Sequence, residues 1–377
     1  MEKIIFRKFL YDLISFFLIV SLSLSLIAWV IQSVNYLDFI SKDGHGFKVY
    51  FAIIALNFPK IFSKVIIFSY FISLFYVIQK YQINNEILIF WTNGISRLKL
   101  TNFIIKTSII LTIIQIVFVY SIVPKTQDYS REFIRTSNMD LFTSLITEKK
   151  FIDTLKDFTL FVENIDEEGN MKNIFLKDSL DKINTQIVTA RSGKIIENGS
   201  KKFLSLNFGQ ILDITNNNPN ESKIIKFNST NFNLSNFKTK STIFPKFQEL
   251  NSSILISCVN NFLFGNKENY FLPIFSCSKE SSIKSAKEIF NRSIKQLYLI
   301  VVGIMASILI FSNDRKPKFI MNKIIIFSVG ILCIIISEVN SELINLSLQS
   351  NILFISLPFI IFFMGYIAIL NLNNKRF

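Results

Sequence analysis

Charged side chains occur in pairs beside the long apolar runs of this sequence. The members of each pair are three or four residues apart, a spacing that puts both side chains on one face of a helix. Two cationic groups on one face can bind a phosphate, and two carboxylates can shape the entrance to such a site. We therefore predict phosphate contacts at the basic pairs and a gate region at the acidic pair. The pairs are Lys60 with Lys64, Arg292 with Lys295, and Glu338 with Glu342.

Catalytic chemistry has few candidates. The single histidine, His45, lies in the stretch "DGHG" and is interpreted as a surface residue. The sequence has no G-x-x-x-x-G-K-[ST] loop for ATP, no H-E-x-x-H, no G-x-S-x-G and no Cys/His cluster. We expect no catalytic residues, no cofactor and no metal site, and we expect any ATP hydrolysis to take place on a separate chain.

Six apolar runs have few or no charges, and most are near the ~20 residues that cross a bilayer. They predict six transmembrane helices, the first of which follows an N-terminus that does not resemble a cleaved signal peptide. In this setting the paired charges have a second interpretation, as snorkelling side chains and interhelical salt bridges. The runs are Leu13–Val34, Ile61–Ile78, Phe103–Val123, Leu297–Phe311, Ile324–Ser337 and Ile352–Leu370.

The positive-inside rule predicts the orientation, because Lys and Arg concentrate in alternate loops. Both termini are expected in the cytoplasm, and the interval of about 124–293 outside it. The net charge of +14 is attributed to topology and anionic lipid, so no nucleic acid is expected. The cytoplasmic cations are Lys3, Arg7, Lys8, Lys80, Arg97, Lys99, Arg315, Lys316, Lys318, Lys323, Lys375 and Arg376.

The outside interval changes period after about residue 150. Short segments rich in β-branched and aromatic residues, such as "FTLFVENID" and "KKFLSLNFGQILDI", are separated by turn sequences such as "DEEGN" and "TNNNPNES". They predict an all-β, sandwich or jelly-roll-like domain over about 151–250. Short helices over "FQELNSSILISCVNN" and "SSIKSAKEIFNRSIKQL" are expected to lead back to the membrane. Cys258 and Cys277 could pair, but their spacing does not decide it.

The predicted plan is therefore an α-helical membrane protein of six transmembrane helices with an inserted all-β domain between helices three and four. Its parts are 1–123 with helices one to three, 124–293 outside the cytoplasm, and 294–377 with helices four to six. The segment "NNEILIFWTNGISRLK" interrupts the first part as a short cytoplasmic helix over about 84–96. Asn84 or Asn85 would cap it, Glu86 would complement its dipole and Gly94 would end it.

This short helix has two interpretations. Ile87, Phe90 and Trp91 form an apolar face at helical spacing, which Ile83 extends by one turn. The face could pack on the inner surface of the membrane, or it could dock on a soluble partner.

Several phrases, in their order along the chain, resemble the LptF/LptG family of lipopolysaccharide export permeases. They include "WVIQSVNYLDFI", "LNFPKIF", "NNEILIFWTNGIS", "LFVENIDEEGNMKNIFLKD", "ARSGKI" and "KEIFNRSIKQL". The first phrase is more similar to LptF than to LptG. Where the family commonly has a His and a Pro before helix four, this chain has Phe290 and Gln296, which leaves open any local role assigned there.

The resemblance implies a permease subunit of an ABC-type exporter in the bacterial inner membrane. Such a subunit pairs with an LptG-like permease, is driven by an LptB-like ATPase dimer, and passes lipopolysaccharide to LptC-like and LptA-like periplasmic β proteins. Glu86 would match the family's acidic residue in the ATPase groove, with Ile87, Phe90, Trp91 and Gly94 in the same coupling segment. The alternative is a permease-like scaffold or regulator whose periplasmic domain binds another envelope protein; an intramembrane enzyme has no good candidate residue.

Overall fold

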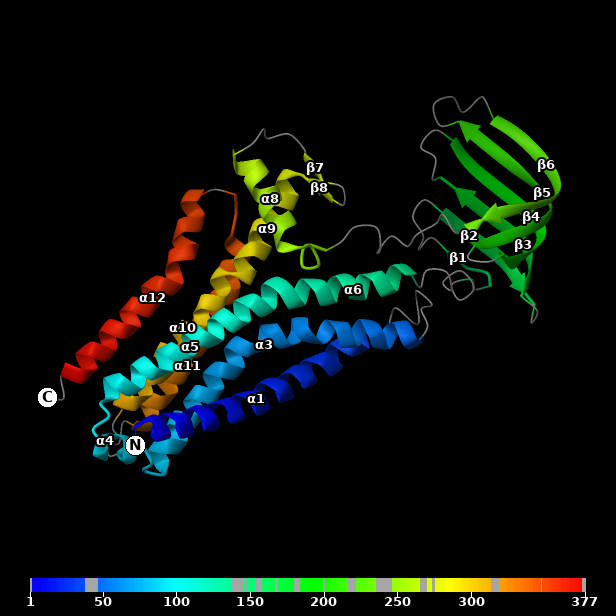
Figure 1. The fold of residues 1–377 in the computed structure, drawn as a ribbon. Helices are drawn as coiled ribbons and strands as arrows, with labels where there is room; N and C mark the ends of the chain where they lie inside the picture. The colour runs from blue at the N-terminus through cyan, green and yellow to red at the C-terminus, as the bar shows by residue number, and fades with distance from the viewer. Residues whose placement is uncertain are drawn as a thin grey trace. The chain divides into compact units, whose positions relative to one another are not determined.

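The structure, a computed structural model, falls into two compact units that we describe separately (Figure 1). The helical unit comprises 1–31, 57–128 and 246–377, and the sheet unit comprises 32–56 and 129–245. The cations Lys42, Arg315, Lys316, Lys318, Lys375 and Arg376, and His45, lie outside the described residues. The structure describes residues 2–37, 47–136, 146, 148–152, 158–166, 169–179, 184–198, 201–215, 222–234, 246–264, 270–272, 275–312, 319–346 and 348–374.

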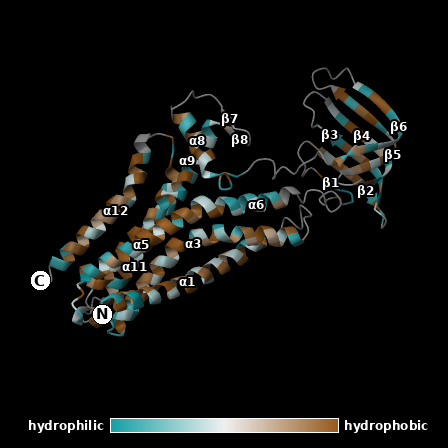
Figure 2. Ribbon diagram, in the orientation of Figure 1, coloured by the Kyte–Doolittle hydropathy of each residue, from teal (hydrophilic) through white to brown (hydrophobic). Residues whose placement is uncertain are grey.

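Six helices within the described residues are long and apolar enough to cross a membrane, and each contains one of the predicted runs. The prediction of six transmembrane helices is therefore confirmed. Figure 2 shows hydrophobic residues along these helices. In chain order the six are α1 (Glu2–Asn35); α3 (Phe47–Ile83); α5 (Arg97–Val117) with η1 (Phe118–Ile122) and α6 (Val123–Thr136); α9 (Lys279–Arg292) with η5 (Ile294–Leu297), α10 (Tyr298–Ser307) and η6 (Ile308–Phe311); α11 (Phe319–Leu343); and α12 (Leu348–Asn374).

The third of these helices continues beyond its apolar run, to Phe133 and further. A π-helical turn, η1, joins α5 to α6 just before Pro124. Proline has no N–H to donate to the preceding turn, so the helical hydrogen-bond pattern is interrupted here, and η1 lies at this interruption. A short helix, α4 (Ile87–Thr92), joins α3 to α5. We call the end of the bundle that contains α4 and the start of α1 the terminal end, and the opposite end, where α5 passes into α6, the insertion end (Figure 1).

The bundle packs around α10, whose residues are nearly all buried. Gly303 lets α5 approach closely, because a Cβ there would lie 2.3 Å from the Ser108 hydroxyl oxygen. That hydroxyl also lies 2.8 Å from the Tyr70 hydroxyl of α3. Small residues at helix contacts and polar pairs between helices are typical of membrane bundles. These contacts join α3, α5 and α10.

The sheet unit contains one antiparallel sheet of six described strands, in which each strand pairs with its neighbour in sequence. This confirms an all-β domain inserted between the third and fourth membrane helices, and the sheet is compatible with the expected jelly-roll-like fold. Its buried face carries alternate residues of several strands, such as Phe158, Leu160 and Val162 on β2. The strands are β1 (Phe151–Ile152), β2 (Phe158–Ile165), β3 (Asn170–Asp178), β4 (Asn184–Asn198), β5 (Lys201–Thr215) and β6 (Ser222–Asn233).

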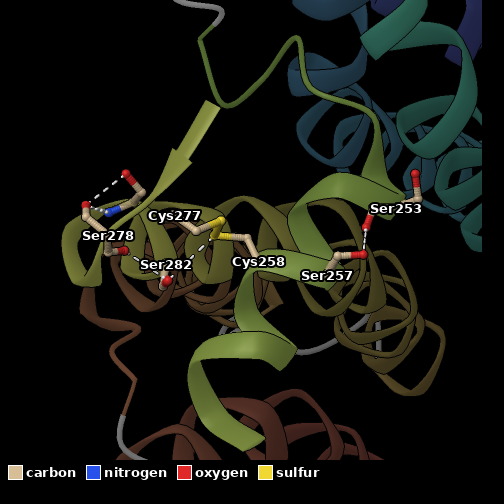
Figure 3. The surroundings of a disulfide bond; sticks show 7 residues. Ser253, Ser257, Cys258, Cys277, Ser278 and Ser282 are labelled. Carbon is tan, nitrogen blue, oxygen red and sulfur yellow. Dashed lines mark hydrogen bonds between the residues drawn. A yellow bond between two sulfur atoms is a disulfide. The ribbon is translucent and has the colours of Figure 1, made fainter. Parts of the chain in front are cut away.

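The chain that follows the sheet belongs to the helical unit. Its described part begins at Lys246 and forms α8 (Ser252–Phe264), β7 (Tyr270–Leu272), β8 (Phe275–Cys277) and α9. Both short helices predicted here are present, whereas the small hairpin of β7 and β8 was not predicted. A disulfide joins Cys258 of α8 to Cys277, and both cysteines are buried (Figure 3). Ser278 caps α9 by accepting from the Ser281 N–H. The disulfide ties α8 to the residue that precedes the cap of α9.

Close packing between α3 and α11 predicts a sensitive position at Gly330. A Cβ at Gly330 would lie 2.1–2.8 Å from the ring of Phe71, which is fully buried and stacked on Phe327. Because that ring has no room to move, Gly330→Val should lower the thermal unfolding midpoint in detergent, at a cost of about 1–3 kcal/mol for overpacking. Val329→Ile, one residue earlier and 38% exposed, is the control and should leave the midpoint unchanged. Equal midpoints for the two variants would contradict the packing described here.

Candidate functional site

A charged pocket of about 210 Å³ lies at the insertion end of the bundle. It brings together charged side chains from four elements: α3, α9, η5 and α11. Five of the six charged residues chosen from the sequence line it, and Glu288 of α9 joins them. The charged lining residues are Lys60, Lys64, Glu288, Lys295, Glu338 and Glu342, and the polar ones are Ser63, Gln248, Asn291, Gln296 and Ser341.

Each acid of the pocket has a basic partner. The Lys295 ammonium lies 2.7 Å from a carboxylate oxygen of Glu338, and Lys287 lies 3.0 Å from Glu342. Glu288 pairs with Arg292 one turn along α9, at 2.9 Å. These pairs tie the end of α11 to α9 and η5, and they neutralise the carboxylates.

Lys60 and Lys64 have no ion pair within the part of the chain that the structure describes. Since the three carboxylates are already neutralised, these two ammonium groups leave the pocket with two uncompensated positive charges. Lys64 is exposed and Lys60 is partly buried. A partly buried cation without a counter-ion is costly, so an anion in this pocket would be stabilised by both lysines.

Arg292 is placed differently from the other chosen residues. Its side chain is 1% exposed and is not part of the pocket lining. The guanidinium donates to the Gln248 and Leu250 carbonyls at 3.1 and 3.0 Å and to the Ser252 hydroxyl at 2.8 Å. It is thus occupied within the chain, holding the segment before α8 against α9. The structure thus gives Arg292 partners within the chain, and the phosphate contact expected there stays a prediction.

Gln296 adds a largely buried polar side chain to the pocket. Its side chain is 5% exposed, and its amide NH₂ donates to the Asn291 carbonyl at 2.7 Å. Its amide oxygen has no hydrogen-bond partner within the described residues, and the side-chain oxygen of Asn291 is in the same state. Such buried acceptors are rare in proteins and favour a ligand or water that donates a proton.

The short helix predicted near residue 84 is present as α4, at the terminal end. It begins one residue later than a cap at Asn85 would imply: Glu86 occupies the N-cap position, without a side-chain cap. Its end is as predicted, because Gly94 has a φ of +74°. The Gly94 N–H donates to the Trp91 carbonyl and the Ile95 N–H donates to the Phe90 carbonyl, which is the hydrogen-bond pattern of a Schellman motif.

The residues after Gly94 complete the turn. Ile95 is 1% exposed and packs into the core, and the Ser96 hydroxyl accepts from the Lys99 N–H to start α5. The triplet Gly-Ile-Ser therefore stops one helix, fixes the turn and caps the next. Ser96 was not chosen from the sequence, although a serine directly before a helical run is a recognised N-terminal signal.

The apolar face of α4 predicted from Ile87, Phe90 and Trp91 packs on the chain's own bundle. Phe90 is 1% exposed, and the other two are partly buried against the same core. The apolar residues left on the outer surface of this segment are Leu88 and Ile89, about half exposed, and Ile83 before them. Any partner would therefore meet these outer residues and Glu86, whose side chain is 27% exposed.

A polar contact between α1 and α3 at the terminal end was also missed. The Tyr81 hydroxyl donates to a carboxylate oxygen of Asp12 at 2.7 Å. The available signal was an acid inside the helix and directly before the apolar run Leu13–Val34, in "KFLYDLISFF". A charged residue inside a membrane span normally has a partner within the protein.

Comparison with protein families identifies the chain. A family model described as lipopolysaccharide export system permease LptF/LptG matches residues 7–372, which is nearly the whole sequence. The chain belongs to the LptF/LptG family. The match covers both permeases under one description, so it does not decide between LptF and LptG.

Family membership and six apolar helices indicate a multi-pass inner-membrane protein. A curated relative, an uncharacterized protein of Rickettsia prowazekii (strain Madrid E), is 22% identical over 209 residues, which is 55% of this chain. The chain spans 57% of the length of that relative. The two departures from the family pattern noted above are both buried in this LptF/LptG protein. Phe290 is a buried aromatic residue of α9, and Gln296 is a polar residue that lines the pocket.

The hydrogen bonds of Arg292 predict a large loss of stability on its removal. Arg292→Met would leave the Glu288 carboxylate and several buried acceptors without their donor, which should cost about 3–5 kcal/mol. Lys284→Met removes a cation from an exposed pair with Glu280 on the same helix and should not change the thermal unfolding midpoint. Unfolding midpoints in detergent test this. A small, equal shift in both variants would contradict a structural role for Arg292.

Proposed function

We propose that this chain is a permease subunit of an ABC-type exporter that extracts lipopolysaccharide from the inner membrane and passes it to a periplasmic bridge. Membership of the LptF/LptG family carries the proposal. The charged pocket supports it, because lipopolysaccharide carries phosphates and Lys60 and Lys64 lack a counter-ion within the described residues. These lysines, with Lys295 beside them, are the proposed lipid-phosphate contacts.

The proposed orientation puts the terminal end in the cytoplasm and the insertion end at the periplasmic side. It follows from the distribution of Lys and Arg along the chain. In this frame 1–123 and 294–377 carry the membrane helices, 124–293 is periplasmic, and the segment of about 84–96 meets the cytoplasm. The partners are an LptG-like permease, an LptB-like ATPase dimer, and LptC-like and LptA-like β proteins.

ATP is hydrolysed by the separate ATPase, and α4 receives the resulting motion. Glu86, Leu88 and Ile89 present a mixed acidic and apolar surface to the ATPase. Ile87, Phe90 and Trp91 anchor the same helix to the bundle, and Gly94 sets its end. A short helix with one face in its own bundle and the other face on a partner can move the helices on either side of it.

Glu338 and Glu342 form the proposed gate region through their ion pairs with Lys295 and Lys287. Both pairs join the end of α11 to the helix that leads into α10. An anionic ligand in the pocket competes with Glu338 for Lys295, because both anions reach the same ammonium group. Lipid binding would in this way loosen the end of α11.

The test of the proposed function is affinity purification of the chain in mild detergent, with mass spectrometry of the co-purifying proteins and an ATPase assay. We expect a second six-helix permease and an ATP-binding subunit, and hydrolysis that is weakened or uncoupled by Glu86→Ala. Lys106→Ala is the control, because Lys106 lies on α5 and outside α4. Recovery of the chain without an ATPase would contradict the exporter and favour the scaffold alternative.

The phosphate contacts have their own test. Replacing Lys60 and Lys64 with Glu reverses both uncompensated charges, so photo-crosslinking of this protein to lipopolysaccharide should fall by roughly tenfold or more, the factor for 1.4 kcal/mol. Replacing Lys284 with Glu is the control, because Lys284 lies in an exposed pair with Glu280 and neither of these two residues lines the pocket. Undiminished crosslinking in the Lys60 and Lys64 variant would contradict the phosphate contacts and favour the interpretation of these lysines as snorkelling side chains.

A further inference from the structure

An aromatic cluster at the terminal end connects α4 with α1, a helix to which α4 has no direct chain connection. Phe90 of α4 lies edge-on to Phe6 and Phe9 of α1, with ring centroids 6.0 and 6.2 Å apart. Phe9 also lies edge-on to Tyr81 at the end of α3, at 5.5 Å. Phe103 of α5 lies 4.5 Å from Phe6. Phe9 and Phe90 are each 1% exposed, so their rings are held on all sides.

Charged contacts reinforce the same junction. The Lys8 ammonium lies 4.0 Å from the Glu86 carboxylate, directly before α4, and Lys99 of α5 donates to Glu2 at 2.8 Å. The bond from Tyr81 to Asp12 lies one turn further along α1. The start of α1 is thus bound to α3, α4 and α5 by both aromatic and polar contacts.

The rest of α1 has a weaker hold on the bundle. Its buried residues form one narrow stripe with a spacing of four: Phe9, Leu13, Phe17, Ser21 and Ser25. The large side chains of the stripe all lie in the first half, and only serines continue it. The outer face of the helix is apolar and exposed, as at Ile19, which is 63% exposed. The terminal end is therefore where a force can be applied to α1.

The segment that carries Phe90 is stiff. Asn85 and Gly94 both have positive φ, and backbone hydrogen bonds close the turns on either side of α4. The Ser96 cap then starts α5 without a loop. A push on the outer surface of α4 therefore displaces Phe90 as part of a rigid piece.

We propose that the contact of Phe9 with Phe90 transmits the motion of α4 to α1, which makes Phe9 a positioning residue of the exporter. The inference rests on the proposed function, since it assumes that an ATPase moves α4. Edge-to-face rings packed without free space cannot slide past each other, so α1 must follow when Phe90 moves. A motion of α4 at the cytoplasmic surface is then passed to α1, whose outer face contacts the interior of the membrane.

The test uses the assembled complex, reconstituted with lipopolysaccharide, and compares Phe9→Leu with Phe17→Leu. Both variants shorten a buried aromatic residue on the inner stripe of α1, but Phe17 contacts Tyr70 of α3 and not α4. We expect Phe9→Leu to keep ATP hydrolysis while lipopolysaccharide delivered per ATP falls roughly three- to tenfold, the factor for lost aromatic pair contacts. Phe17→Leu should leave that ratio unchanged.

Distances between spin labels at Ile19→Cys on α1 and Ile360→Cys on α12 report the motion of α1 relative to a helix outside the segment from α3 to α5. Trapping the complex with nucleotide and vanadate should change this distance in the unsubstituted and Phe17→Leu proteins, and the change should be lost in Phe9→Leu. Phe90→Leu removes the same ring contact from the α4 side. It therefore tests the proposal if Phe9→Leu does not fold.

Equal delivery per ATP and equal distance changes in all variants would overturn the inference. A complex with the unsubstituted chain that neither hydrolyses ATP nor delivers lipopolysaccharide would instead overturn the proposed function.

Discussion

The structure depends on one constraint: inside hydrocarbon, every polar group must be satisfied by the protein itself. The long apolar helices meet it for their backbones, and several of their polar side chains meet it by hydrogen bonds to a neighbouring helix. The Gln82 amide donates to the Leu309 carbonyl at 2.8 Å, and the Gln115 amide donates to the Ser63 carbonyl at 2.9 Å. The Asn340 amide donates to the Tyr298 hydroxyl at 2.8 Å. These bonds fix the register between helices whose apolar faces alone would allow sliding.

The same constraint concentrates charge at the two ends of the bundle. At the terminal end, the charges hold α1 to the segment around α4, and the aromatic cluster fills the space beneath them. At the insertion end, ion pairs join α9 and η5 to α11 around the pocket, leaving Lys60 and Lys64 without partners among the described residues. In the proposed exporter, one end receives motion and the other binds the lipid phosphates.

The sequence predicted the elements that follow from hydropathy and turn chemistry. Runs such as Phe103–Val123 gave the membrane helices, Gly94 gave the end of α4, and alternating segments gave the β domain. The pocket was anticipated in part, because spacing along a helix places Lys60 near Lys64. The sequence could not show that three different elements bring Lys60, Lys295 and Glu338 to one pocket, because that depends on how the helices pack.

Other features were out of reach for related reasons. Arg292 and Lys295 look alike in the sequence, yet one is buried among carbonyls and the other lines the pocket. The apolar face of α4 was expected to meet the membrane surface or a soluble partner, whereas it packs on the chain's own bundle, and this packing depends on the position of α1. The pairing of Cys258 with Cys277 depends on α8 lying beside α9, which spacing does not fix.

Transport itself is the most direct measurement. The chain, co-expressed with a second permease and an ATPase, would be reconstituted into liposomes that contain lipopolysaccharide, and a soluble β acceptor carrying a photo-crosslinker would be added outside. The account predicts that lipopolysaccharide appears on the acceptor only with hydrolysable ATP and only when this chain is present. Hydrolysis of ATP by the assembled complex without any transfer above the ATP-free level would contradict it.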